Sequence, residues 1–321
     1  MSDKERTAAR DGQFPNPQPA SKRSSSRVKR PEWLKIRIGA GPVDQRVREV
    51  LRDGSLHTVC ESARCPNKGE CFGRGTSTFL ILGNACTRDC GFCAVPHGPV
   101  APPDPGEPER VAAAAKRLEL KYVVVTSVTR DDLPDGGAHH FAATIAALRH
   151  ELPDSRIEVL IPDFQGKRAA LELIAAARPD VLNHNIETVS RLYPTVRPGA
   201  VYQRSLAVLT YFRQRGFPTK SGMMLGMGES DEEILSAFSD LLQAGCQILT
   251  LGQYLQPSRH HLPVERFVAP DEFDALAGIA RGMGFAMVAA GPLVRSSYMA
   301  EGCAEILGEK SSTDKLSANA S

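Results

Sequence analysis

The sequence of 321 residues contains no apolar run that approaches the roughly 18 consecutive residues of a membrane-spanning helix. Its first residues have no apolar core segment, so we expect no secretory signal. The chain also shows no repeat at a fixed residue period, and its formal net charge is only +2. What remains, with 42% hydrophobic and 24% charged residues, is the composition of an ordinary globular protein.

The charge that is present is unevenly distributed. Residues 1–30 hold eight Lys and Arg residues against three acidic ones, so this segment carries +5 and the rest of the chain −3. Because an acidic body does not suit a nucleic-acid backbone, we expect no nucleic-acid partner, and without an apolar run we expect no membrane partner. We predict that residues 1–30 form a disordered basic arm and that 308–321, which are small and polar, form a disordered tail.

Between these tails, short β-branched runs alternate with longer amphipathic stretches. Strands are predicted at 78–82, 122–128, 156–161, 181–186, 219–225 and 247–251, with an additional late strand at 285–289. Helices are predicted at 107–120, 137–152, 167–177, 202–216, 230–245 and 271–284.

Six βα units predict an α/β protein with a parallel sheet and right-handed crossovers, which fits a doubly wound sheet or an incomplete barrel. We favour a partial (β/α)6 TIM-like barrel over residues 78–289. Residues 31–77 are then an N-terminal extension and 290–307 a C-terminal segment, each covering one side of the open barrel. Polar residues follow several strands, as at 126–127, 163, 183–185 and 253–254, which places the active site at the mouth of the barrel.

Six of the eight cysteines lie between positions 60 and 93. Without an export signal this crowding indicates metal binding rather than disulfides. Cys86, Cys90 and Cys93 follow the first predicted strand, and three thiolates on a 4Fe–4S cluster leave one iron open to a small molecule. The alternative is a Cys3His zinc site completed by His97.

A second set of three cysteines, Cys60, Cys65 and Cys71, precedes the first and also lacks an obvious fourth ligand. His57 could complete a zinc site here. Two incomplete sets side by side are more typical of two iron–sulfur clusters, one with an exchangeable position and one with a fourth ligand that is not cysteine. We expect the remaining two, Cys246 and Cys303, to be packing residues.

Together these residues resemble the lipoyl synthases, a family of radical S-adenosylmethionine (SAM) enzymes. The resemblance is carried by the Cys-x3-Cys-x2-Cys motif with Phe92 before its last cysteine, by the second cysteine set and by the segment Arg-Ser-Ser-Tyr at 295–298. Further matching segments lie at 30–35, 129–138, 183–188 and 196–200, so the resemblance spans residues 30–307.

The resemblance implies that Cys86, Cys90 and Cys93 hold a 4Fe–4S cluster whose open iron binds SAM. It implies that Cys60, Cys65 and Cys71, with Ser297 as fourth ligand, hold an auxiliary 4Fe–4S cluster that donates sulfur. The implied reaction inserts sulfur at carbons six and eight of an octanoyl group on a carrier lysine, through a 5′-deoxyadenosyl radical made from SAM. Implied catalytic residues are Cys86, Cys90, Cys93 and Ser297.

The family also implies several partners. These are octanoylated lipoyl domains of 2-oxoacid dehydrogenase complexes, the glycine-cleavage H protein, a ferredoxin or flavodoxin-type electron donor, and iron–sulfur cluster carrier proteins. The bacterial cytoplasm is the expected compartment, in preference to a mitochondrial matrix. The basic arm could steer docking of an acidic carrier.

Asn185, Glu187 and Arg197 are our candidates for polar contacts to SAM, since they follow the fourth predicted strand. The alternative is a loop ion pair between Glu187 and Arg197. We expect Asp131 and Asp132 to be solvated or helix-capping, and His139 and His140 to lie at the surface.

Two other functions remain open. A biotin synthase-like enzyme is disfavoured because the second cysteine set here precedes the first. A zinc- or iron–sulfur-containing scaffold or electron carrier would not need six βα units.

Overall fold

The computed structural model describes residues 30–34, 41–62, 65, 67–73 and 77–297. The predicted arm before Arg30, the predicted tail, Cys303 and residues 298–307 of the predicted C-terminal segment lie outside these residues. The strands are β1 (His57–Thr58), β2 (Thr78–Ile81), β3 (Tyr122–Ser127), β4 (Arg156–Leu160), β5 (Val181–Asn183), β6 (Thr219–Leu225), β7 (Ile248–Gln253) and β8 (Met287–Gly291).

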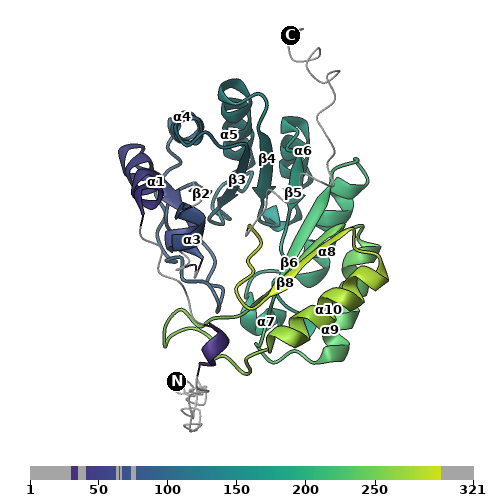
Figure 1. The fold of residues 1–321 in the computed structure, drawn as a ribbon. Helices are drawn as coiled ribbons and strands as arrows, with labels where there is room; N and C mark the ends of the chain where they lie inside the picture. The colour runs from purple at the N-terminus through teal and green to yellow at the C-terminus, as the bar shows by residue number, and fades with distance from the viewer. Residues whose placement is uncertain (1–29, 35–40, 63–64, 66, 74–76, 298–321) are drawn as a thin grey trace, which may run out of the picture.

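Helices alternate with these strands (Figure 1). The long ones are α1 (Pro42–Asp53), α4 (Glu107–Arg117), α5 (Ala138–Glu151), α6 (Arg168–Ala177), α8 (Tyr202–Arg213), α9 (Asp231–Gln243) and α10 (Pro270–Met283). The short ones are η1 (Glu32–Leu34), α2 (Val59–Ser62), α3 (Lys68–Gly73), η2 (Phe164–Gly166), η3 (Ser190–Leu192) and α7 (Tyr193–Val196).

Local sequence explains where these helices begin. Ser230 and Glu233 form a reciprocal capping box at the start of α9, in which each side chain accepts a hydrogen bond from the other residue's backbone N–H. Pro270 occupies the first turn of α10, where its missing N–H costs nothing. All six helices predicted between the strands are confirmed within a few residues at their ends.

The strands form one sheet in the order β1 to β8, so every strand neighbours the next one along the chain. The sheet is parallel from β2 to β8, whereas β1 runs antiparallel to β2. A doubly wound sheet would reverse its strand order, and this one does not. Within the described residues β8 pairs with β7 alone, so the partial barrel is confirmed. The predicted late strand is also confirmed, as β8.

The predicted fourth strand is shorter than expected and ends at Asn183. Backbone hydrogen bonds to β6 continue past this point, from the N–H of His184 to Lys220 and from that of Glu187 to Gly222, but the N–H of Ile186 donates to the side chain of Ser221. The regular pairing is therefore interrupted rather than ended, and Glu187, which has a positive φ of 64°, still forms a parallel bridge with Met223 of β6.

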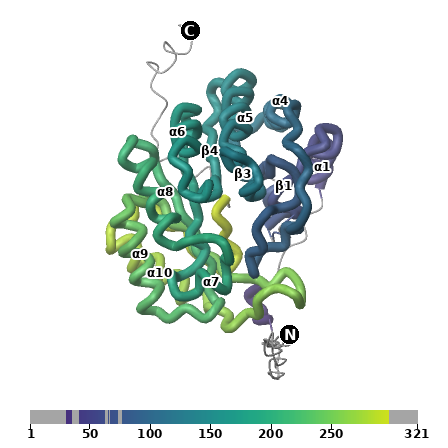
Figure 2. The backbone as a smooth tube through the Cα atoms, turned by 180° about the vertical axis from the view of Figure 1, so that it is seen from behind, coloured from purple at the N-terminus to yellow at the C-terminus, as the bar shows by residue number. Residues whose placement is uncertain are grey.

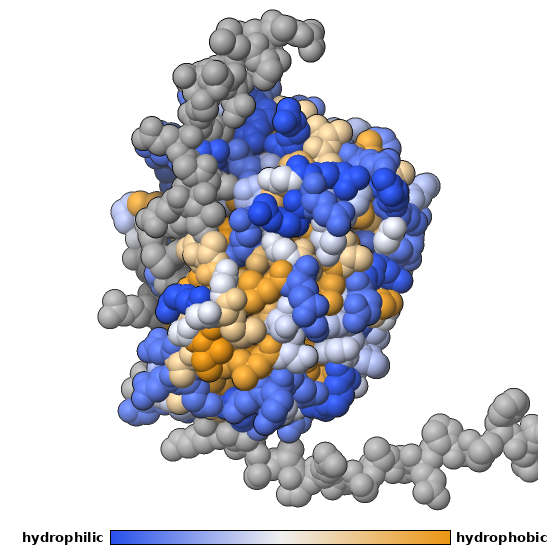
Figure 3. All heavy atoms as spheres, turned by 90° about the vertical axis from the view of Figure 1, so that its right-hand side faces the viewer, coloured by the Kyte–Doolittle hydropathy of each residue, from blue (hydrophilic) through white to orange (hydrophobic). Residues whose placement is uncertain are grey.

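The core is divided between the two halves of the sheet. One apolar cluster joins β2–β4 to α1, α4, α5 and α6, and the other joins β6–β8 to α9 and α10. The long helices cover the outer face of the curved sheet (Figure 2). The one face of the molecule seen in Figure 3 is largely hydrophilic with apolar patches between. In the described part of the chain, no helix has the length and apolar composition that a membrane span needs.

The two segments outside the barrel meet each other. The amide of Asn67, which precedes α3, donates a hydrogen bond of 2.6 Å to the carbonyl of Leu293, 226 positions away. The carbonyl of Pro292 accepts a hydrogen bond of 3.3 Å from the N–H of Gln253 at the end of β7. The residues after β8 therefore run back across the mouth to the N-terminal extension (Figure 1).

Candidate functional site

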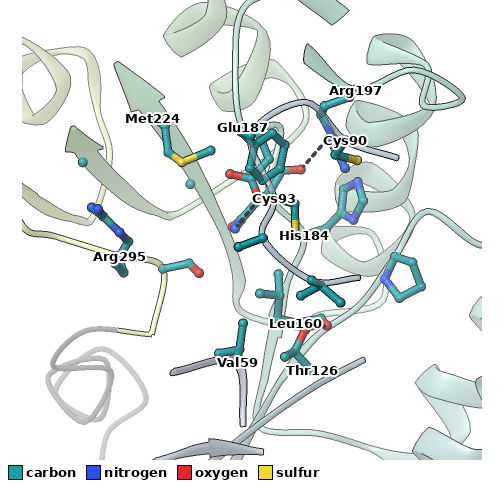
Figure 4. Close-up of a pocket in the computed structure, with 18 of the residues that line it drawn as sticks. Val59, Cys90, Cys93, Thr126, Leu160, His184, Glu187, Arg197, Met224 and Arg295 are labelled. Atoms are coloured by element: carbon teal, nitrogen blue, oxygen red, sulfur yellow. Dashed lines mark hydrogen bonds between the residues drawn. The ribbon is translucent and has the colours of Figure 1, made fainter. Parts of the chain in front are cut away.

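The mouth of the barrel encloses a cavity of about 300 Å³. Its lining comes from the carboxyl ends of the strands, from the loop after β2 and from residues 294–296 (Figure 4). The polar lining includes Cys86, Cys90, Cys93, Thr126, Ser127, His184, Asn185, Glu187, Arg197 and Arg295. The predicted location of the site at the mouth is therefore confirmed.

The loop after β2 brings the first cysteine set into this cavity. The N–H of Cys86 donates to Pro96 (2.8 Å) and that of Cys93 to Cys90 (2.9 Å), which folds the loop back on itself. The sulfur of Cys86 accepts two backbone N–H groups, from Thr129 at 3.3 Å and from Arg88 at 3.4 Å. Such donors stabilise the thiolate that a metal requires.

Burial raises the pKa of the Cys93 thiol to about 12 and also raises that of Cys90. Without a metal these thiols are therefore protonated at neutral pH, and metal binding must release their protons.

The zinc alternative does not fit this loop. His97 has a side chain that is 60% exposed, and its Nδ1 lies 3.2 Å from Asp89 instead of turning toward the thiols. Among the residues that the structure describes, no three His, Cys, Asp or Glu side chains converge on a point that a single metal ion could occupy. All three cysteines line the same cavity, whereas His97 does not.

The second cysteine set lies in a smaller pocket next to the first. Its lining consists of Cys60, Cys65, Asn67, Cys71, Ser77, Thr78, Arg295 and Ser297. The predicted fourth ligand, Ser297, is thus brought to the three cysteines from the other end of the chain. His57 does not line this pocket, so the zinc alternative is not supported here either. Burial raises the pKa of the Cys60 thiol to about 11.

Arg295 belongs to both cavities. Its guanidinium donates to the carbonyl of Val294 at 2.6 Å, and burial lowers its pKa despite the nearby acidic groups of Cys65 and Glu187. The two cysteine pockets are therefore neighbours that share one wall.

All three candidate SAM contacts line the larger cavity, with Glu187 and Arg197 on one side of it (Figure 4). Asn185 donates to Glu187 at 3.0 Å, while Arg197 donates to the carbonyl of Asn185 at 2.9 Å and to the hydroxyl of Tyr193 at 3.0 Å. Arg197 thus bonds to main-chain carbonyls and a phenol, so the alternative of a direct Glu187–Arg197 ion pair is not what forms. Two buried atoms here, Asn185 Oδ1 and Arg197 Nε, have no hydrogen-bond partner.

Burial raises the pKa of Glu187, although the charge of Arg197 opposes this. An acidic group and unsatisfied polar atoms in one buried wall are suited to a polar ligand.

His184 is a cavity residue that the sequence analysis did not single out. Its Nδ1 lies 2.8 Å from the carbonyl of Ile161, so this nitrogen carries the proton. Its Nε2 is buried without a partner, and burial lowers its pKa to about 4. Its position between two asparagines just after β5 was the only sequence signal.

Other predictions had mixed outcomes. Cys246 is buried, as predicted. Asp132 is exposed, as its solvated alternative predicted, and pairs with Arg130, whereas Asp131 is only partly exposed and pairs with Arg88; neither caps α5, whose N-cap is Gly137. His139 is exposed as predicted, but the prediction for His140 was wrong: its side chain is only 9% exposed, and its Nε2 lies 2.7 Å from Glu107. The helix places the two histidines on different faces.

Two family models match the chain. The Radical SAM superfamily model matches residues 80–241, and the model of the N-terminal domain of lipoyl synthase matches residues 1–65. A lipoyl synthase of Methylococcus capsulatus is 58% identical over 284 residues, which cover 88% of each chain. One of Chlorobium phaeovibrioides is 55% identical over 277 residues, covering 85% of this chain and 97% of the relative.

Solved structures support the fold alone. SuiB of Streptococcus suis, bound to S-adenosylmethionine, has a TM-score of 0.53 at 13% identity, with 70% of this chain and 54% of that protein covered. HydG, a hydrogenase maturase, has a TM-score of 0.53 at 14% identity, with 77% and 63% covered.

Proposed function

The chain belongs to the lipoyl synthase family of radical SAM enzymes, and from this premise we propose how its residues divide the work of inserting two sulfur atoms into a protein-bound octanoyl group. Membership implies SAM and a 4Fe–4S cluster. We assign Cys86, Cys90 and Cys93 as the ligands of this cluster. The support is that all three line the larger cavity, on a loop whose backbone donates two hydrogen bonds to the sulfur of Cys86.

The second proposed centre is an auxiliary 4Fe–4S cluster held by Cys60, Cys65, Cys71 and Ser297. The observation that carries this proposal is the smaller pocket, which these four residues line together although they come from opposite ends of the chain. Alkoxide is a harder ligand than thiolate and a poorer match to iron–sulfur chemistry. Ser297 is therefore the ligand that we expect to leave first when the cluster gives up sulfur.

Asn185, Glu187 and Arg197 are proposed as the SAM contacts of the larger cavity. Asn185 and Arg197 each have a buried polar atom without a hydrogen-bond partner, and SAM carries the amino, carboxylate and hydroxyl groups that such atoms bind. When bound, the cluster and SAM supply the radical chemistry that an unactivated alkyl carbon requires.

The octanoyl chain is proposed to lie against the apolar wall of the same cavity. This wall consists of Val59, Leu80, Val95, Leu160 and Ile161. Val59 precedes Cys60 directly, so the wall leads from the first cysteine set toward the second. A chain that extends along it passes from one proposed centre to the other.

The substrate of this family is a protein, because the octanoyl group is carried on a lysine. We propose lipoyl domains and the glycine-cleavage H protein as carriers, a ferredoxin or flavodoxin-type donor of electrons, and cluster carrier proteins that rebuild the auxiliary centre. We also propose a bacterial cytoplasmic location, where thiols stay reduced. The domain division proposed is a 78–289 barrel with extensions at 31–77 and 290–307 and arms beyond.

The test incubates anaerobically purified protein with SAM, a reductant and an octanoylated carrier peptide, and follows the peptide by mass spectrometry. Addition of two sulfur atoms is expected, together with about eight iron atoms per chain. A peptide that gains no sulfur would contradict the function, and a zinc-only protein would contradict both clusters.

Ser297→Cys provides the first residue-level prediction. The cluster should be retained, but sulfur insertion in a single cycle should slow about 10-fold or more, because a thiolate leaves iron less readily. Ser296→Cys is the matched control, since Ser296 lines the larger cavity and not the smaller pocket. Full single-cycle turnover by Ser297→Cys would contradict the proposed role.

A further inference from the structure

The loop that carries the first cysteine set is hydrogen-bonded to the loop after β3, through residues 86–88 of the first loop and 129–131 of the second. The N–H and the hydroxyl of Thr87 both donate to the carbonyl of Thr129, at 3.0 and 2.9 Å. The N–H of Asp131 donates back to the Thr87 hydroxyl at 3.0 Å. The N–H of Thr129 donates to the sulfur of Cys86 at 3.3 Å. Residues 86–88 and 129–131 therefore form one hydrogen-bonded unit.

The side chain of Arg88 locks this unit. Its Nε and Nη2 donate to both carboxylate oxygens of Asp131, at 2.6 and 3.0 Å, and Nη2 also donates to Asp163 at 2.6 Å. The side chain of Arg88 is only 6% exposed and that of Asp163 is fully buried. Arg204 adds a second cation at 3.2 Å from Asp163, which balances the charges of the group.

This arrangement is well suited to orient the backbone. A two-oxygen pair between guanidinium and carboxylate fixes direction as well as distance. The backbone N–H of Arg88 is itself one of the two donors to the sulfur of Cys86. Because Asp131 and Asp163 fix its guanidinium, Arg88 keeps its own backbone N–H on the sulfur of Cys86. Its pairing with Asp131 also fixes the neighbouring loop, which keeps the N–H of Thr129 on the same sulfur.

Hydrogen bonds to cluster sulfurs and the net charge around a cluster both set its reduction potential. N–H donors stabilise the more negative, reduced state and so raise the potential. We propose that Arg88, anchored by Asp131 and Asp163, is a positioning residue that holds two N–H···S hydrogen bonds on Cys86 and thereby makes the SAM-binding cluster easier to reduce. This inference rests on the proposed assignment of Cys86 as a cluster ligand.

The variant Asp131→Asn distinguishes a positioning effect on the reduction potential from a direct effect of charge, because the two effects have opposite signs. Removing a negative charge near the cluster would by itself raise the potential. Loosening the anchor of Arg88 lowers it, because the N–H···S bonds lengthen. We therefore expect Asp131→Asn to shift the midpoint potential of the SAM-binding cluster to more negative values, as measured by an anaerobic redox titration followed by electron paramagnetic resonance on the full chain.

Asp132→Asn is the matched control. It makes the same charge change one residue away, and Asp132 pairs with Arg130 at 2.8 Å rather than with Arg88. Its potential should stay unchanged or rise. Thr87→Val removes the hydroxyl bridge without any charge change and should also lower the potential. Iron content and thermal unfolding of each variant show that the cluster and fold are retained.

A rise or no change in potential in both Asp131→Asn and Thr87→Val, with full iron content, would overturn the inference. A fall in both, with Asp132→Asn not falling, supports it. The underlying assignment has its own test, since Cys86→Ala should lose about four iron atoms. Retention of all iron in Cys86→Ala would contradict the assignment of the ligand, independently of what the potentials show.

Discussion

At the scale of single residues, the site is notable for polar atoms that are buried and unsatisfied. His184 Nε2, Asn185 Oδ1, Arg197 Nε and Ser127 Oγ all belong to residues that line the larger cavity. A buried polar atom without a hydrogen bond costs about 1–3 kcal/mol, so several together indicate a place where bound water or a ligand supplies the missing partners. The same wall also carries the proposed SAM contacts.

Arg197→Ala should weaken SAM binding by about 10- to 100-fold, the range expected for losing hydrogen bonds to a charged group. The guanidinium holds the carbonyls of Asn185 and Ile186, so its loss also releases the loop that carries Glu187. Equilibrium binding of SAM to the reconstituted protein measures the effect. Arg191→Ala, which removes an exposed arginine paired with Glu233, is the control. Unchanged affinity in Arg197→Ala would remove this residue from the site.

His184 should make folding stability depend on pH. Burial lowers its pKa from 6.5 to about 4, so the unfolded chain binds a proton between these values and the native chain does not. Its contribution to stability is full above about pH 6.5 and is lost as the pH falls toward 4. Urea unfolding of the cluster-free protein between pH 7 and 4.5 measures this slope, and His184→Gln should reduce it. An identical slope in the variant would show that His184 is not the titrating group.

At the scale of elements, the loops after the strands carry the chemistry and the strands fix where those loops start. Gly252 in β7 shows how closely another segment approaches. A side chain at this position would run into the carbonyl of Val294 and the guanidinium of Arg295. The glycine therefore allows residues 292–297 to lie directly on the end of β7 and to reach the second cysteine set.

Gly252→Ala should displace this segment and disturb the auxiliary centre more than the barrel. We expect the iron of that centre to be lost several-fold faster to a chelator, with little change in SAM binding. Gly278→Ala is the control, because Gly278 lies on α10 with open space where a side chain would be added. Equal iron loss in the two variants would contradict the close approach as the cause.

At the scale of the whole molecule, segments from both ends of the described chain pack against the open barrel. The N-terminal extension contributes β1 to the edge of the sheet at β2, and the residues after β8 cross the mouth to reach Asn67. The auxiliary pocket therefore exists only when the first and last described segments are both in place.

Deleting residues 292–321 should destabilise one of the two proposed centres and leave the other unchanged. The barrel and the first cysteine set should remain, while the auxiliary pocket loses the wall formed by Arg295 and Ser297. Iron release to a chelator should then become biphasic, with about four atoms released fast and about four at the rate of the full chain. A single rate for all iron would contradict the division.

Local features of the sequence were sufficient for much of the fold. The six βα units and the late strand were predictable because hydrophobic periodicity and turn residues act over a few positions. The shortened β5 was not, since the interruption of its pairing depends on the side chain of Ser221 on β6, which lies 35 positions from Ile186. His140 was misassigned for the same reason, because its partner Glu107 lies on another helix.

The sequence alone determined the residues from which the chemistry is proposed: two sets of three cysteines on a βα framework. The type and the spacing of these side chains are local properties, which can be identified from the sequence without knowledge of the fold. Only the tertiary structure decided which residues surround these cysteines. That Ser297 reaches Cys60, and that Arg88 meets both Asp131 and Asp163, depends on closing chain segments far apart in the sequence, and the packing of the whole barrel supplies the free energy for this closure.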